Sequence, residues 1–480
     1  MTQFMRNTDA FALGMEGDAR LRSTVVSIVV LDTPPDWDVL VDRLERVARL
    51  MPMFRQRVVR SLPPAPPRWV YDQDFDLRYH LSRVKAPAPG TLATVLEMGR
   101  RADMDEFDHS RPMWHVTLVE GLADGGAALL VKLHHALADG IGGVQISQLV
   151  FDLEPEPRDL GPLPPVPPVS DEGHLDALWH TVKYDAAGMS RWARRIATST
   201  PRTLLDGVRR PRATAGAVAG TAASVYRTVR PINHTASPIM QQRRMIRELG
   251  VHDVPLVALK EAGHRAGGSL NDAFLAAVTG GMRRYHALHG VSVDELKVTM
   301  PISIRAAEDP AGGNRITLMR IALPVAMADP VARIAEIHER AVAARHERSL
   351  PYTQSIAGGL NLLPRWYIGA ILRHVDFLAS NVPGMPVQMY VGGAAVRMQY
   401  AFGPTIGAGV NITLMTYRDT CALGINADSG AVPDFLQFQE CLVAGFDEVL
   451  TLAAPKQPPP RRHREAAVGR SARPATKDAS

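Results

Sequence analysis

The stretch Val131-Lys-Leu-His-His-Ala-Leu-Ala-Asp-Gly140 decides the predicted fold, because an apolar run ends there in two adjacent histidines and an Asp-Gly pair. Residues 127–133 are almost wholly apolar and predict a strand, whereas residues 144–153 have the spacing of a helix. The histidines therefore lie in a strand-to-helix turn. Such a turn can hold polar side chains at the rim of a cleft.

Each polar residue of this turn has a chemical use. A neutral histidine accepts a proton near physiological pH, so His134 and His135 are candidate general bases. Asp139 can orient a ring or brace the turn, and Gly140 allows backbone conformations that a Cβ would forbid. The alternative is that both histidines are structural and that the Asp-Gly pair only forms a turn.

Length and composition indicate an ordinary globular protein. A chain of 480 residues is long enough for two domains of roughly 150 to 250 residues each, and 46% of its residues are apolar. No apolar run reaches the roughly 18 to 20 residues that a spanning helix needs, and the first residues lack a secretory core. We therefore expect a cytoplasmic protein without a membrane span.

Composition gives no support for metal, redox or nucleic-acid chemistry. Cys421 and Cys441 lack the spacing of metal ligands and are expected to be ordinary thiols. The net charge of +5 comes largely from arginines set among Ala, Val and Leu, without the aromatics and glycines of an RNA-binding surface. We expect no metal and no nucleic-acid partner.

The first 160 residues alternate between predicted strands and helices. Asp36 is a plausible N-cap for a helix that places Leu40, Leu44 and Val47 on one face. Gly125-Gly126 is predicted to join two strands as a hairpin that leads to His134. The other predicted elements are strands at residues 23–31, 54–59 and 114–119 and a helix at residues 91–104.

A linker and a basic segment follow the first domain. Residues 154–168 are too rich in proline for a helix or a central strand, and residues 176–230 have a helical, arginine-rich pattern. Such a segment can lie on an anionic membrane surface, or it can pack on the body of the protein and expose its arginines. We divide the chain into domains at residues 1–160 and 236–455, a linker with the basic segment at 161–235, and a disordered basic tail at 456–480.

The second half again alternates between strands and helices. Asp253 is predicted to cap a helix that ends near Ala266, and Ser303 and Arg305 are predicted to share one face of a strand. Residues 380–384, Ser-Asn-Val-Pro-Gly, are predicted to form a turn. Further helices are predicted to begin at residues 267–272, 329–330 and 433. Further strands are predicted at residues 316–323, 387–391, 396–401, 410–417 and 421–426.

Five motifs in order resemble the bacterial wax ester synthase and acyl-CoA:diacylglycerol acyltransferase (WS/DGAT) family. They are His134-His-Ala-Leu-Ala-Asp-Gly140, Asn271-Asp272, Pro301-Ile-Ser-Ile-Arg305, Gly313-Asn314 and Ser380-Asn-Val-Pro-Gly384. Around residues 106–114 the chain departs from the family's pattern, with Glu-Phe-Asp and Arg-Pro-Met-Trp in place of Pro-Leu-Asp and Arg-Pro-Leu-Trp. This family is part of the superfamily of CoA-dependent acyltransferases, which also contains chloramphenicol acetyltransferase, carnitine acyltransferases and peptide-synthetase condensation domains.

The resemblance implies a fold and a mechanism. Two chloramphenicol-acetyltransferase-like α/β domains with mixed sheets would enclose an active-site tunnel at their interface. His135 would be the general base, Asp139 would pair with Arg305, and His134 and Gly140 would support the turn. The candidates for substrate binding, some of which also suit capping or turn roles, are Asn271, Ser303, Asn314, Ser380 and Asn381.

The implied reaction moves a long-chain acyl group from acyl-CoA to diacylglycerol or a fatty alcohol, without a cofactor. CoA would take part only as a piece of the substrate, and the protein could be peripheral at the inner membrane face or at lipid inclusions. Two alternatives stay open: an acyltransferase for a polyketide or glycolipid hydroxyl, and a non-catalytic protein that binds lipid granules. The intact spacing of His135 and Asp139 argues against the second alternative.

Overall fold

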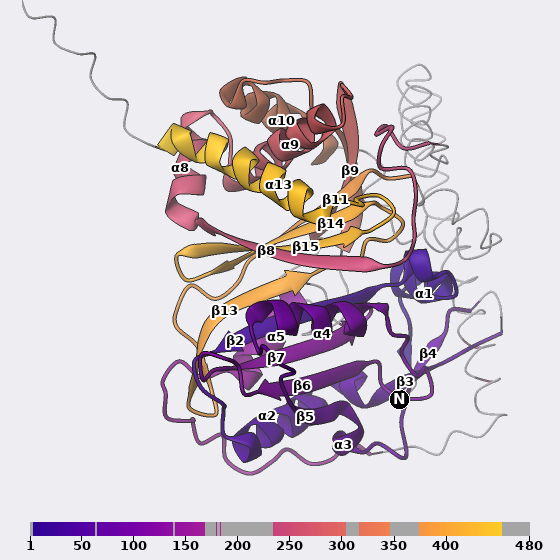
Figure 1. Ribbon diagram of the computed structural model, residues 1–480. Helices are drawn as coiled ribbons and strands as arrows, with labels where there is room; N and C mark the ends of the chain where they lie inside the picture. Colours follow the sequence, from indigo (N-terminus) through magenta and orange to yellow (C-terminus); the bar gives the residue numbers. More distant parts are fainter. Residues whose placement is uncertain are drawn as a thin grey trace, which may run out of the picture.

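The computed structural model describes residues 3–62, 65–137, 140–168, 234–303, 316–345 and 374–453, together with residues 179 and 183. These residues form two six-stranded sheets and a small three-stranded sheet (Figure 1). Both large sheets mix parallel and antiparallel pairs, so the predicted α/β class with mixed sheets is confirmed.

The first large sheet has the strand order β12-β13-β2-β7-β6-β5. β6 and β7 form the predicted hairpin, and β7 pairs with β2 along its whole length. The register places Thr24 opposite His134, so the motif lies at the end of two central strands. The bounds are β2 (Thr24–Leu31), β5 (Leu81–Lys85), β6 (Trp114–Glu120), β7 (Ala127–His134), β12 (Tyr390–Val391) and β13 (Ala394–Phe402).

β12 and β13 come from the second half of the chain but belong to the sheet of the first half (Figure 1). β13 pairs antiparallel with β2 from Leu31 opposite Val396 to Val26 opposite Phe402. The chain then returns to the other sheet through residues 403–409. The two halves are therefore joined by backbone hydrogen bonds as well as by packed side chains.

The second large sheet has the order β10-β9-β11-β14-β15-β8, in which β11 is parallel to both of its neighbours. Its strands are β8 (Arg247–Pro255), β9 (Glu295–Ser303), β10 (Ile316–Pro324), β11 (Phe377–Val382), β14 (Val410–Tyr417) and β15 (Thr420–Asp428). The small sheet is formed by β1 (Gln3–Phe4), β3 (Gln56–Val59) and β4 (Arg68–Tyr71).

Helices cover the outer faces of both sheets, and α4 lies between the sheets (Figure 1). The Cβ position of Gly99 in α4 lies 3.1 Å from Ile28 of the first sheet and 3.4 Å from Leu249 of the second, so α4 contacts both. The helices are α1 (Asn7–Met15), α2 (Trp37–Leu50), α3 (Leu77–His80), α4 (Leu92–Met104), α5 (Gly140–Val150), α8 (Leu256–Arg265), α9 (Leu270–Leu288), α10 (Pro330–Arg345) and α13 (Phe435–Leu450), with 3₁₀ turns η1 (Ala19–Leu21), η2 (Pro52–Arg55) and η4 (Thr451–Ala453).

α2 forms as its sequence pattern predicts. The Asp36 carboxylate accepts hydrogen bonds from the N–H groups of Asp38 and Val39, which would otherwise lack partners at the helix start. Leu40 and Val47 are fully buried on the face that meets the first sheet. This face becomes one wall of the cavity described below.

The prediction that Asp253 caps a helix is wrong. Asp253 lies inside β8, and the helix, α8, begins three residues later at Leu256. β8 pairs with β15 over nine residues, from Arg247 opposite Asp428 to Pro255 opposite Thr420. Asp253 accepts a hydrogen bond from the Tyr400 hydroxyl at 3.1 Å, so tertiary contacts override its preference for a helix cap.

The prediction of a turn at residues 380–384 is also wrong for its first three residues. Ser380, Asn381 and Val382 belong to β11 and pair in parallel with Thr413, Leu414 and Met415 of β14. Pairing with a central strand therefore outweighs the turn preference of Ser and Asn.

Several predicted features lie outside the described residues: Asp139, Arg305, Asn314, most of the basic segment and the tail after residue 453. Among the helices that are described, none has both the length and the apolar character needed to cross a bilayer. Within the same residues, no three His, Cys, Asp or Glu side chains are grouped as a metal site would need.

Candidate active site

His134 is held by a network that uses both of its ring nitrogens. Its side chain is fully buried, Nδ1 accepts a hydrogen bond from the Ala136 N–H at 3.1 Å, and Nε2 lies 3.2 Å from Glu16 Oε1. Because Nδ1 accepts, Nε2 carries the proton of the neutral ring and donates it to Glu16. His134 therefore shapes the turn and has no ring nitrogen left for a substrate.

Glu16 is a residue of this network that sequence reasoning missed. Its carboxylate also accepts the Ser23 N–H at 2.6 Å, which connects the segment before β2 to the motif. Burial alone would raise the pKa of Glu16, but the hydrogen bonds from His134 and Ser23 hold that pKa below its ordinary value. No local pattern marks Glu16, because its partner His134 lies 118 residues away.

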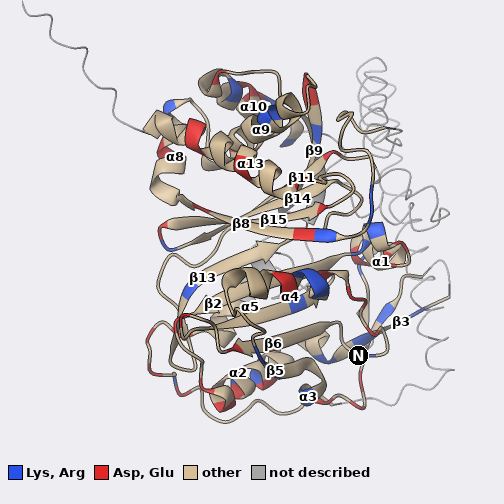
Figure 2. Cartoon of the chain, in the orientation of Figure 1, with Lys and Arg blue, Asp and Glu red and all other residues tan. Residues whose placement is uncertain are grey.

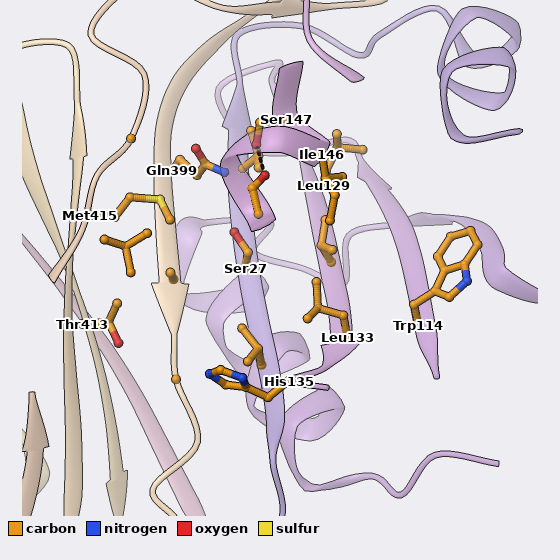
Figure 3. A pocket seen from close by; sticks show the side chains of 18 of the residues that line it. Ser27, Trp114, Leu129, Leu133, His135, Ile146, Ser147, Gln399, Thr413 and Met415 are labelled. Carbon is orange, nitrogen blue, oxygen red and sulfur yellow. Dashed lines mark hydrogen bonds between the residues drawn. The ribbon is translucent and has the colours of Figure 1, made fainter. Parts of the chain in front are cut away.

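His135 lines a cavity of about 220 Å³ between the two halves of the chain. Its backbone N–H donates to Ser23 O at 2.9 Å, which fixes the position of the turn beside β2. Figure 3 shows the ring of His135 at one end of the cavity, with Thr413 and Met415 entering from the second sheet. The ring thus lies where chain segments from both halves meet.

One arm of the cavity is apolar and runs along the first sheet away from His135. Its wall is built from alternate residues of β2 and β7, which pair as Val25 with Leu133, Ser27 with Val131 and Val29 with Leu129. From Val25 to Val29 the arm is about 13 Å long. Residues of α2, α5 and β6 complete the arm: Leu40, Leu44, Val47, Ile146, Val150, Trp114 and Val116.

The strands around the cavity carry almost no charge. β2, β11 and β14 contain no Asp, Glu, Lys or Arg (Figure 2). In the arm, the Ser27 hydroxyl donates to Tyr400 O at 3.1 Å and the Ser147 hydroxyl donates to Gly143 O at 2.9 Å. Because the protons of these hydroxyls are used within the protein, the arm can hold a hydrocarbon chain without leaving them unpaired.

The structure places some of the predicted substrate-binding residues at the cavity and others away from it. Ser380 lines the cavity together with Leu378 and Val382, as alternation along β11 requires, whereas Asn381 is exposed on the opposite face. Asn271 lies in the first turn of α9 and does not line the cavity. The backbone of Ser303 ends β9, and its side chain lies outside the description.

Trp114 forms part of the cavity wall and is fixed from behind by His80. The two rings stack with centroids 4.5 Å apart, and the Nδ1–H of His80 donates to Trp114 O at 2.8 Å. Trp114 Nε1 donates to Phe54 O at 2.9 Å. Burial lowers the pKa of His80 to about 4, so this ring is neutral at physiological pH.

Comparison with known proteins assigns the chain to a family. The model described as the wax ester synthase/diacylglycerol acyltransferase catalytic domain matches residues 5–274, and the WS/DGAT C-terminal domain matches residues 312–449. The chain belongs to the WS/DGAT family. A Mycobacterium tuberculosis relative with the provisional name of a diacylglycerol O-acyltransferase is 36% identical over 92% of this chain and 91% of its own length.

Solved structures agree with the WS/DGAT fold. The wax ester synthase/diacylglycerol acyltransferase from Marinobacter aquaeolei is similar with a TM-score of 0.61 and 20% identity, covering 94% of this chain and all (100%) of its own. The first condensation domain of the calcium-dependent antibiotic synthetase is similar with a TM-score of 0.60 and 15% identity, covering 95% and 98%. As a member of the WS/DGAT family, the chain is an acyltransferase.

Replacing Glu16 tests the network around His134. We expect Glu16→Ala to lower the free energy of unfolding by about 1 to 3 kcal/mol, because two buried donors lose their acceptor. Glu16→Gln keeps one acceptor oxygen and should lose less. Urea unfolding followed by tryptophan fluorescence measures both variants, and equal losses would contradict a role for the acceptor oxygen.

Replacing His80 tests its buried neutral state. The unfolded chain takes up a proton near pH 6.5 but the folded protein only near pH 4, so this residue's contribution to stability falls as pH is lowered between these values. The expected loss is about 1.4 kcal/mol per pH unit in that window. His80→Phe keeps an aromatic ring and removes the titration, so its unfolding free energy should depend less steeply on pH than that of the wild type. Parallel pH profiles for the two proteins would contradict this account.

Proposed function

We propose that the chain transfers a long-chain acyl group from acyl-CoA to the hydroxyl of diacylglycerol or a fatty alcohol. The observation that carries this proposal is the position of His135 at one end of a cavity whose long arm is apolar. The arm fits an acyl chain, since its walls are hydrocarbon and its hydroxyl protons are used within the protein. Family membership supplies the reaction class.

In this proposal His135 is the general base of a direct transfer. Its ring takes the proton of the acceptor hydroxyl while the hydroxyl oxygen forms a bond to the thioester carbonyl carbon. The carbon–sulfur bond then breaks, and the departing CoA sulfur takes the proton back from His135. A positioned base of this kind contributes roughly 10²- to 10⁴-fold to the rate.

Among the described residues, no cysteine offers a thiol for an acyl-enzyme at this cavity. Cys421 is buried in the core of the second sheet and Cys441 lies on α13, and neither lines the cavity. The hydroxyl of Ser237 lies 2.8 Å from Nε2 of His286, but both residues are buried away from the cavity. Direct attack by the acceptor is therefore the simpler course.

Replacing His135 tests the proposed base. Purified protein is assayed for release of the CoA thiol from palmitoyl-CoA in the presence of diolein or hexadecanol. We expect His135→Ala to lower acceptor-dependent release by about 10²- to 10⁴-fold. His264→Ala, on the exposed side of α8, is the matched control and should behave as the wild type. Equal acceptor-dependent release in wild type and His135→Ala would overturn His135 as the base, and no such release from either protein would favour a lipid-binding protein without catalysis.

Narrowing the apolar arm tests the place of the acyl chain. Val29 lies at the end of the arm remote from His135, so Val29→Phe should exclude long chains while shorter chains still reach the base. We expect kcat/KM to fall at least about tenfold for palmitoyl-CoA relative to octanoyl-CoA, since several methylene groups lose their burial at about 0.8 kcal/mol each.

The matched control for this variant is Val30→Phe, because the side chain of Val30 points to the opposite face of β2 and packs beside α4. Its chain-length preference should equal that of the wild type. If Val29→Phe also retains the wild-type preference, the acyl chain does not occupy this arm.

A further inference from the structure

Neighbouring residues determine whether the Thr413 hydroxyl donates or accepts its hydrogen bond within the protein. Asn411 Nδ2 lies 2.7 Å from Pro404 O, and because a carbonyl oxygen can only accept, the Asn411 amide must donate there. Asn411 Oδ1 therefore faces Thr413, whose hydroxyl donates to it at 3.1 Å. The proton of Thr413 is used, so Thr413 Oγ1 offers the cavity only lone pairs.

The space for this unit is provided by Gly403. A Cβ at residue 403 would lie 2.6 Å from Asn411 Nδ2 and 3.2 Å from Thr413 Oγ1, which is too close for the amide to keep its position. Asn411 and Thr413 are 2% and 3% exposed, so bulk water does not compete for their hydrogen bonds. The cavity wall thus contains a hydroxyl whose proton is donated to Asn411 and whose oxygen can accept a hydrogen bond.

Thr413 lies at the junction of the two halves and not in the apolar arm. Asn411, Thr413 and Met415 line the cavity as alternate residues of β14, opposite the strands that form the arm. Ser380 is the register partner of Thr413 on β11 and faces the same space. A group that reaches His135 from the second sheet therefore passes these two hydroxyls.

We propose that Thr413 is a substrate-positioning residue that accepts a hydrogen bond from an N–H or O–H of the bound substrates other than the reacting hydroxyl. This inference rests on the proposed function. The reacting hydroxyl donates to His135, so the donor at Thr413 must be a second one. The pantetheine arm of acyl-CoA supplies amide N–H groups, and an acceptor with two neighbouring hydroxyls supplies an O–H.

Two variants distinguish the contribution of the Thr413 hydroxyl from that of the side-chain volume. Thr413→Val keeps the volume and removes the oxygen, whereas Thr413→Ser keeps the oxygen. KM and kcat are measured for wild type and both variants with palmitoyl-CoA, using hexadecanol and its vicinal diol as acceptors. Loss of one hydrogen bond corresponds to a change of about tenfold.

The substrate that donates the hydrogen bond to Thr413 decides which kinetic property Thr413→Val changes. If the pantetheine arm is the donor, Thr413→Val raises KM for palmitoyl-CoA about tenfold with both acceptors, with kcat largely retained. If the second hydroxyl of the acyl acceptor donates the hydrogen bond, Thr413→Val instead removes a preference for the diol over hexadecanol. Thr413→Ser restores the wild-type behaviour in either case.

The proposal is overturned if the wild type turns over and Thr413→Val leaves both KM for palmitoyl-CoA and the diol preference unchanged. A uniform loss that Thr413→Ser does not restore also contradicts it, because the role would then be structural. Absence of turnover in the wild type contradicts the proposed function itself, and the two failures are therefore distinguishable.

Discussion

The pairing of β13 with β2 is the interaction on which the site depends. It places a strand from the second half of the chain beside the strand that carries Val25, Ser27 and Val29. The turn that follows β13 contributes Gly403 and Pro404 to the cavity wall, and β14 then contributes Thr413. The apolar arm belongs to the first sheet and Thr413 to the second, and β13 ties the second half of the chain to the first sheet by backbone hydrogen bonds.

Alternation along β2 gives that strand two functions at once. Val25, Ser27 and Val29 face the cavity, while Val26 and Ile28 are fully buried in the cluster that joins α4 and the second sheet. The hydrogen bond from Ser27 to Tyr400 O adds a side-chain contact to the backbone pairing of β2 and β13. A shift of one residue in this pairing would turn core residues into the cavity, so the sheet register also sets which side chains line the cavity.

The parts of the fold that local sequence decides were predictable, and those that distant pairing decides were not. The hairpin leading to His134 and the cap of α2 follow from turn residues and hydrophobic spacing. β8 was missed because its Asp253 has a helix-cap preference and its strand character comes from pairing with β15. Ser380 was assigned to a turn for the same reason, since its partner Thr413 cannot be read from its own neighbours. The role of Glu16 and the direction of the hydrogen bond from Thr413 likewise depend on contacts that no sequence pattern shows.

The difference between the two adjacent histidines also follows from the strand. His134 is the last residue of β7 and points into the core, where Glu16 and the Ala136 N–H occupy its ring nitrogens. His135 comes after the strand, and its ring therefore emerges on the cavity side. A core histidine whose tautomer is fixed keeps the turn in one conformation, and the turn sets the place at which His135 enters the cavity wall. The first histidine fixes the turn, and the second lines the cavity.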